Sequence, residues 1–86
     1  MLQVHFKPSF IRQVNRLPKA LQDELIEKIA LFKNSRNHRA LRVHKLHGHL
    51  KDCYGFSVNF RFRVVFEYTS KTEAVLLAIG DHSMYE

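Results

Sequence analysis

Several features that define common protein classes are missing from this chain of 86 residues. It contains one cysteine, so an internal disulfide cannot form and a disulfide-stapled secreted scaffold is excluded. No apolar run approaches the ~20 residues that span a bilayer, and the first residues lack the apolar core of a signal peptide. Internal repeats and Gly/Ser linkers are also absent. We therefore expect one small domain over residues 1–86, located in the cytoplasm and without membrane contact.

Motifs for cofactor chemistry are equally scarce. The sequence has no Gly-rich phosphate loop, no nucleophile elbow and no paired catalytic carboxylates. His44, His47 and His49 lie close together, but no cysteine or carboxylate joins them at a ligand spacing, and Cys53 is interpreted as a small apolar residue at the start of a strand. We expect neither a metal ion nor a small-molecule cofactor.

Positive charge is what the chain has in excess. Fourteen Lys and Arg against eight Asp and Glu give a net charge of +6. Residues 33–63 hold eight basic side chains and one acid, Asp52, together with four of the six histidines. A block this polarised is typical of surfaces that meet nucleic acid or an acidic protein, although a generic solvated surface is the alternative.

The first half of the chain predicts a strand and two helices. Residues 2–6 alternate as a short strand does. A helix follows with Ser9 as its N-cap, and Pro18 begins a second helix that runs to about Lys33. Apolar residues recur at helical spacing in both, which predicts a helical hairpin with one apolar seam. Residues 35–52 are expected to form a basic connection with a turn at Gly48.

The second half predicts strands. Residues 54–68 alternate between apolar even positions and mostly polar odd positions, over a length that suits two strands. A three-residue loop at 59–61 keeps each face consistent, because it pairs Val58 with Phe62 and Ser57 with Arg63. A turn at 69–72 precedes an interior strand at 74–79 that Gly80 ends, with both faces covered. The fold class is therefore α+β, β-α-α-β-β-β: a helical hairpin packed on one face of a small, mostly antiparallel sheet.

The uncovered face of this sheet and the segment after its last strand carry the candidate site. Arg61 and Arg63 are suited to hold phosphate oxygens, but they could instead be solvated or pair with Glu67 or Glu73. His82 is a candidate proton-transfer group and Tyr85 a candidate stacking ring; the alternatives are a solvated histidine and an aromatic lid on the sheet edge. RNA contacts are expected from a mixed polar and basic set: Lys45, His47, Lys51, Ser57 and Arg61.

Four segments, in this order and on these elements, resemble the RelE/ParE superfamily of bacterial toxins. Residues 45–48 (KLHG) resemble its Leu-x-Gly segment, and residues 52–54 (DCY) resemble the start of the first hairpin strand in RelE. Residues 62–66 (FRVVF) resemble its Tyr-Arg-hydrophobic-hydrophobic-Tyr strand, and residues 79–85 (IGDHSMY) resemble the Gly-x-His…Tyr ending of the ribonuclease branch.

The resemblance implies a metal-independent mRNA endonuclease that acts on the ribosome and is silenced by a cognate antitoxin. Arg63 then matches the strand arginine that supports the scissile phosphate, His82 the terminal acid or base, and Tyr85 the terminal aromatic. His44 sits where the YafQ-like branch places an active-site histidine. His44 is our candidate base and His82 our candidate acid, and the two roles could be exchanged.

Three positions depart from the family pattern. The two strand lysines of RelE align with Gly55 and Ser57, and the loop aspartate of YafQ aligns with Arg61. Two other functions therefore stay open: a ParE-like inhibitor of DNA gyrase, and a non-catalytic RNA- or ribosome-binding module.

Overall fold

A computed structural model describes residues 1–81 of the chain. In chain order its helices and strands are β1 (Gln3–Phe6), α1 (Pro8–Asn15), α2 (Lys19–Phe32), β2 (His44–Lys45), β3 (Tyr54–Ser57), β4 (Phe62–Ser70) and β5 (Glu73–Asp81). The sheet order is β1-β5-β4-β3-β2; β1 and β5 are parallel, and every other pair is antiparallel. The α+β class and the mostly antiparallel sheet are confirmed, with one strand, β2, more than predicted.

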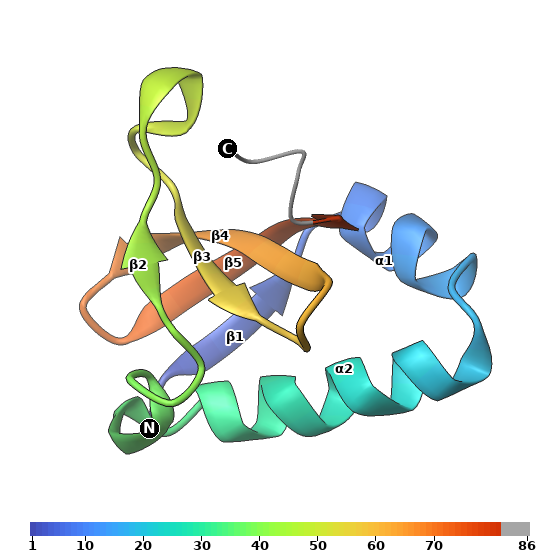
Figure 1. The fold of residues 1–86 in the computed structure, drawn as a ribbon. Helices are drawn as coiled ribbons and strands as arrows, with labels where there is room; N and C mark the ends of the chain where they lie inside the picture. Colours follow the sequence, from blue (N-terminus) through green and yellow to red (C-terminus); the bar gives the residue numbers. More distant parts are fainter. Residues whose placement is uncertain (82–86) are drawn as a thin grey trace.

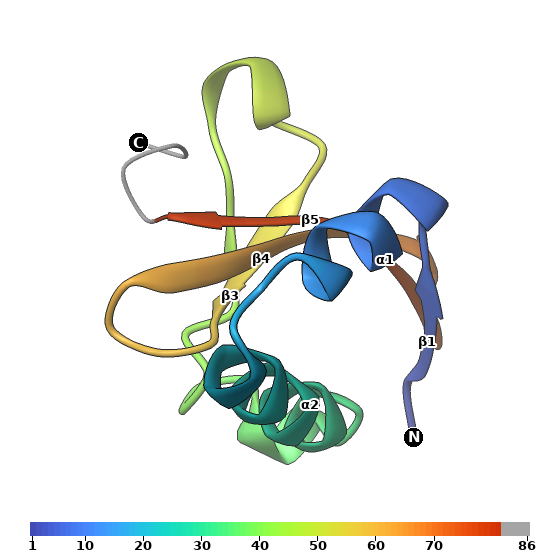
Figure 2. The same cartoon turned by 90° about the vertical axis from the view of Figure 1, so that its right-hand side faces the viewer.

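The helices cover one face of the sheet and build the core with it (Figure 1). In the view of Figure 2, α2 lies below the strands, along the sheet. The fully buried Phe32 of α2 stacks on Phe56 at 4.5 Å and meets Phe66 edge-on at 4.7 Å between ring centroids. Burial of each such ring contributes about 1.5–3 kcal/mol, so this aromatic cluster is the main anchor of α2 on the sheet.

The two prolines take positions at the helix starts that differ from those predicted. Pro8, rather than a residue after Ser9, opens α1, and Lys7 is its N-cap. Because proline has a helix-compatible φ and no N–H to satisfy, Pro8 starts the helix without a serine cap. Pro18 is the N-cap of α2 rather than its first residue, and its carbonyl accepts from the N–H groups of Leu21 and Gln22. The predicted N-cap at Ser9 is therefore wrong by two residues, and the predicted first residue of α2 is wrong by one.

The hairpin between β3 and β4 has the predicted register. Ser57 pairs with Arg63, and the N–H of Val58 donates to the carbonyl of Phe62 at 2.9 Å across the three-residue loop. The loop lacks the glycine that such turns prefer. Instead, the Asn59 side-chain oxygen accepts from the N–H groups of Arg61 and Phe62, each at 2.8 Å.

Strand β5 occupies the predicted interior position but is not fully covered on both faces. A register shift places Val65 opposite Ala78 and Phe66 opposite Leu76, so one extra residue stands on β5. This bulge lets Leu76 and Ile79 both face the core, although their positions differ in parity. The near-continuous apolar run comes partly from this bulge. Gly80 does not end the strand, because it pairs with Arg63.

The segment predicted as a plain connection contains a strand and two short turns. The 3-10 turns are η1 (Ser35–Asn37) and η2 (Gly48–Leu50), on either side of β2. The β2–β3 hairpin rises from the sheet on the side away from α2 (Figures 1 and 2). It therefore forms a wall beside the sheet face that the helices leave uncovered. Within residues 1–81, no helix is long and apolar enough to cross a membrane.

Candidate active site

The strand registers place three predicted site residues on the sheet face opposite the helices. His44 pairs with Gly55 and Ser57 pairs with Arg63, so all four share one face. The neighbouring even-numbered residues of β3 and β4 point into the core instead. His44 is exposed, whereas Ser57 and Arg63 are half-buried. The face predicted from the sequence therefore carries His44, Ser57 and Arg63.

The His44 ring is held in one tautomer. Its Nδ1 lies 2.8 Å from the carbonyl oxygen of Arg42. Because a carbonyl can only accept, Nδ1 carries the proton in this contact, and Nε2 of the neutral ring has a free lone pair. Arg42 has a φ of 58°, in the left-handed region that residues other than glycine rarely occupy. This backbone conformation accompanies the carbonyl contact that leaves His44 Nε2 able to accept a proton.

The His44 ring lies over Gly55. A Cβ built at Gly55 would lie 3.5 Å from His44 Cε1 and 3.5 Å from Leu46 Cδ2. Leu46 and Val65 are both buried, yet they lie outside the main core cluster. The uncovered sheet face is thus partly closed by the β2–β3 hairpin, and the chemistry-bearing residues stand around this small apolar patch.

A groove of about 650 Å³ runs along the β3–β4 loop. The predicted residues Ser57, Arg61 and Arg63 line it, together with Arg42, whose carbonyl holds His44. The further lining residues that sequence reasoning missed include two of α2, one of the loop and one at the end of β5: Glu24, Lys28, Phe60 and Asp81. With four cations and two carboxylates, the groove is electropositive and suited to a polyanion.

Arg61 has an acidic partner that was not predicted. Its Nε lies 2.9 Å from Asp81 Oδ2, and its guanidinium carbon lies 5.3 Å from the centre of the Phe62 ring. The expected partners Glu67 and Glu73 are wrong for Arg61, because the register brings Asp81 opposite Phe62, next to the loop. Asp81 offsets part of the Arg61 charge, whereas Arg63 forms no ion pair within residues 1–81.

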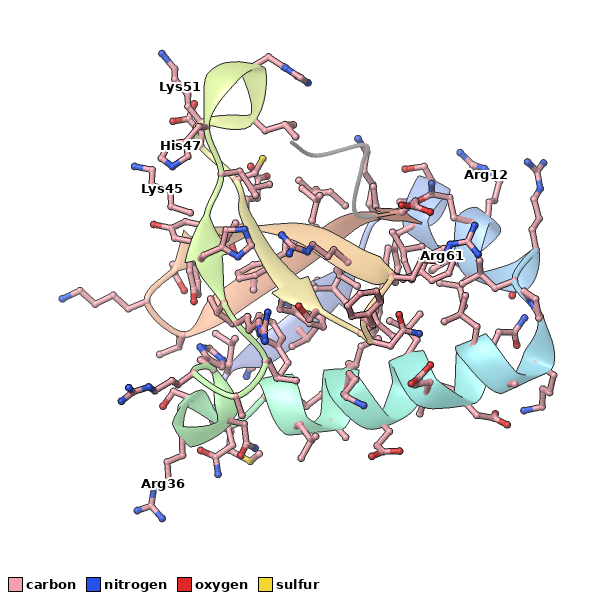
Figure 3. The ribbon with its side chains drawn as sticks, viewed as in Figure 1. Arg12, Arg36, Lys45, His47, Lys51 and Arg61 are labelled. Carbon is pink, nitrogen blue, oxygen red and sulfur yellow. The ribbon has the colours of Figure 1, made fainter. Side chains whose placement is uncertain are left out.

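The predicted RNA-binding set does not form one cluster. Lys45, His47 and Lys51 lie on the protruding β2–β3 hairpin, far from Arg61 in Figure 3. Lys45 also pairs with Tyr54, and the Tyr54 ring packs on Phe66, so Lys45 is on the opposite face from His44. Only Ser57 and Arg61 of this set line the groove. His82 and Tyr85 lie outside the described residues.

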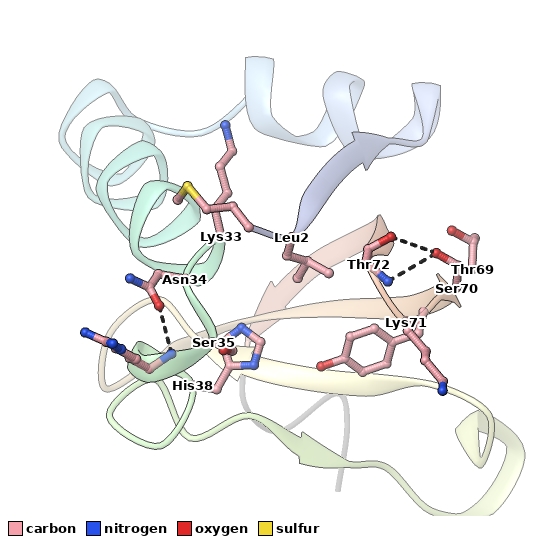
Figure 4. A pocket seen from close by; sticks show the side chains of 12 residues that line it. Leu2, Lys33, Asn34, Ser35, His38, Thr69, Ser70, Lys71 and Thr72 are labelled. Carbon is pink, nitrogen blue, oxygen red and sulfur yellow. Dashed lines mark hydrogen bonds between the residues drawn. The ribbon is translucent and has the colours of Figure 1, made fainter.

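A second hollow, of about 950 Å³, lies at the other end of the sheet (Figure 4). It is lined by cations and hydroxyl groups, among them Lys33 and Lys71, and it contains no predicted site residue. Its histidine, His38, stacks on Phe32 at 4.8 Å and donates from Nε2 to the Phe32 carbonyl at 2.7 Å. This histidine supports the core, so the groove remains the better candidate site.

The described part of the chain offers no metal centre. Among residues 1–81, no group of three or more His, Cys, Asp and Glu side chains could hold a metal ion.

Comparison with known proteins identifies the fold. No protein-family model matches the sequence, and no curated protein matches it significantly. Solved structures do. YafQ from Escherichia coli matches over 98% of this chain and 97% of its own, with a TM-score of 0.76 and 11% identity. The RelBE2 toxin–antitoxin complex of Mycobacterium tuberculosis matches over 94% of this chain and 98% of its own, with a TM-score of 0.75 and 18% identity. The archaeal RelE–RelB complex of Pyrococcus horikoshii matches over 93% of each chain, with a TM-score of 0.73 and 19% identity. The chain has the RelE-like toxin fold.

Proposed function

We propose that this protein is the toxin of a toxin–antitoxin pair and acts as a metal-independent endoribonuclease on mRNA in the ribosome, in the cytoplasm. Two independent observations support the proposal. The fold is shared with chains from toxin–antitoxin complexes. The uncovered sheet face also combines a histidine that can accept a proton with arginines that can hold a phosphate.

The reaction uses the 2′-OH of the RNA as its nucleophile. His44 Nε2 takes the 2′-OH proton as the oxygen attacks the adjacent phosphorus, and Arg63 stabilises the charge that develops on the phosphorane. The bond to the 5′-oxygen breaks, leaving a 2′,3′-cyclic phosphate, and the 5′-oxygen receives a proton from His82. Tyr85 would orient a nucleotide. The roles of the two histidines could be exchanged.

The proposed partner is an antitoxin that is acidic or amphipathic. The groove along the β3–β4 loop is electropositive, which suits an acidic segment. A separate apolar hollow between the two helices exposes Phe6, Ile11 and Ile26, which suits an apolar face. We expect the antitoxin to cover Arg61 and Arg63 or to displace the segment that carries His82. A complex that touches neither region would contradict this expectation.

The observation that carries the proposal is the placement of His44 and Arg63 on one sheet face, with the His44 tautomer set by the Arg42 carbonyl. Cleavage of a defined mRNA on programmed ribosomes tests it. Arg63→Ala and His44→Gln should each slow cleavage about 100-fold or more.

The matched controls change the same residue types elsewhere. Arg36→Ala removes an arginine remote from Arg61 in Figure 3, and His5→Gln removes a histidine of β1, at the other edge of the sheet. Both should cleave at the wild-type rate. Wild-type rates in folded Arg63→Ala and His44→Gln would refute the assignment.

Mapping of cellular RNA 5′ ends after induced expression separates the remaining functions. Ribosome-dependent cuts within codons support the endoribonuclease. DNA damage without such cuts would indicate a gyrase inhibitor, and neither effect would indicate a binding module.

A further inference from the structure

The apolar side chain of Phe60 is exposed to solvent. It lies in the three-residue loop between β3 and β4 and is fully exposed, unlike the partly exposed Phe6. Folded proteins do expose single apolar residues, so exposure alone decides nothing. The way the loop presents this ring is more informative.

Hydrogen bonds of the residues before and after Phe60 in the sequence hold the loop in place. Asn59 Oδ1 accepts from the N–H groups of Arg61 and Phe62, at 2.8 Å each. Asn59 Nδ2 donates to Glu24 Oε1 of α2 at 2.7 Å, which ties the loop to the helix. The loop backbone that presents the ring is therefore well bonded, so little backbone conformational entropy is lost when a ligand contacts the ring.

The neighbours of Phe60 are charged. Phe60 lines the same groove as Lys28, Arg42, Arg61 and Arg63. Protein interfaces usually place an exposed aromatic anchor within an apolar patch that excludes water. The exposed apolar residues Phe6, Ile11 and Ile26 instead lie around the hollow between the helices, which Phe60 does not line.

An exposed ring beside a cationic groove is the arrangement that binds single-stranded nucleic acid: cations hold the phosphates and the ring stacks on a base. We propose that Phe60 stacks on a nucleobase of a single-stranded RNA whose phosphates lie along the arginines of the groove. The inference rests on the proposed function for the identity of the nucleic acid, and it adds a residue that helps to determine where the RNA lies.

A tryptophan reporter tests the contact directly, because the chain contains no tryptophan. Phe60→Trp places the indole at the tip of the loop, and Ile26→Trp places it at an exposed position of α2 as the matched control. The probe is a short single-stranded RNA with 2′-O-methyl groups, which cannot be cleaved. RNA should quench the fluorescence of Phe60→Trp and leave that of Ile26→Trp unchanged. Equal quenching, or none, would overturn the proposal.

Two further variants separate stacking from general apolar contact. Stacking on one base is worth about 1–3 kcal/mol, so Phe60→Ala should weaken binding of the same RNA about 5- to 150-fold. Phe60→Leu keeps an apolar side chain but has no flat ring, and it should bind as weakly as Phe60→Ala. Wild-type RNA affinity in either variant would refute stacking. If Phe60→Ala weakened only antitoxin binding, the ring would be a protein contact and the proposal would be wrong.

Failure of this inference differs from failure of the proposed function. If the wild type cleaves mRNA and Arg63→Ala does not, while Phe60→Ala binds RNA normally, the stacking proposal fails and the endoribonuclease stands. If RNA quenches Phe60→Trp but the wild type cleaves nothing on the ribosome, stacking stands and the endoribonuclease fails.

Discussion

Asn59 supports the three-residue loop between β3 and β4 with its side chain. It makes three side-chain hydrogen bonds: two accepted from loop N–H groups and one donated to Glu24. Asn59→Ala removes all three without adding bulk. We expect this substitution to destabilise the protein and to loosen the loop that carries Phe60 and Arg61.

The expected loss in the free energy of unfolding follows from the surroundings of each hydrogen bond. The bond to the Arg61 N–H is exposed, so water replaces it at a cost of about 0.5 kcal/mol. The bond to the Phe62 N–H is part-buried and contributes about 1 kcal/mol. The bond to Glu24 has a charged acceptor but is also only part-buried, which gives about 1 kcal/mol. The total is about 2–3 kcal/mol, or a fall in Tm of about 10–20 °C for a domain of this size.

Urea and thermal unfolding followed by circular dichroism measure the loss. The matched control is Asn34→Ala, which removes one exposed bond to the Arg36 N–H and should cost less than about 1 kcal/mol. A double-mutant cycle with Glu24→Ala isolates the bond between the loop and α2. If Asn59→Ala were no less stable than Asn34→Ala, the side-chain bonds would not be what holds this loop.

Three other outcomes are expected. Phe32→Ala should lower the free energy of unfolding by about 3–5 kcal/mol in urea titrations, because the ring is fully buried in the aromatic cluster. Asp81→Asn should tighten RNA binding, because Arg61 is released for one more phosphate. The slope of log K against the logarithm of the salt concentration should become steeper by about 0.7. Burial, with smaller contributions from acids that include Glu67, raises the pKa of the Cys53 thiol. Cys53 should therefore react with iodoacetamide more slowly than a free cysteine at mildly alkaline pH, and faster as pH rises or in Glu67→Gln.

The elements whose apolar residues recur at a regular spacing were predictable from the sequence. Alternation over 54–68 fixes which residues of β3 and β4 face the core, and parity alone requires a loop of odd length. The pairing of Ser57 with Arg63 confirms that argument. Helical spacing likewise locates α1 and α2, and the errors at their starts concern which residue is the N-cap: Lys7 instead of Ser9 for α1, and Pro18 itself for α2.

Features that depend on a single long-range contact were not predictable. Strand β2 has only two residues, His44 and Lys45, too few to show any periodicity, so it exists because β3 offers an edge to pair with. The Arg61–Asp81 ion pair joins positions 20 residues apart and depends on the register of β4 with β5. The bulge in β5 also sets that register. In the sequence it contributes only to a near-continuous apolar run, which we interpreted as burial on both faces.

The candidate site shows the same division. The predicted open face indicated Arg63, and the family resemblance indicated His44, but neither indicated how the histidine is oriented. That orientation comes from the Arg42 carbonyl, and a backbone group leaves no signature in the residue type. The sequence does not indicate the positive φ of Arg42 either, because glycine or asparagine would be the usual residue there.

Gly55 gives a physical reason for one departure from the family pattern. The resemblance aligns it with a strand lysine of RelE, so this chain lacks a cation at that position. In the structure, the space beside the missing Cβ contains the His44 ring and Leu46, each with an atom 3.5 Å from where the Cβ would be. An alanine would fit at ordinary contact distance, but the longer lysine chain would start in the volume that the ring occupies. A lysine at position 55 would therefore have to pass around the His44 ring or displace it, whereas glycine leaves the ring in place over β3.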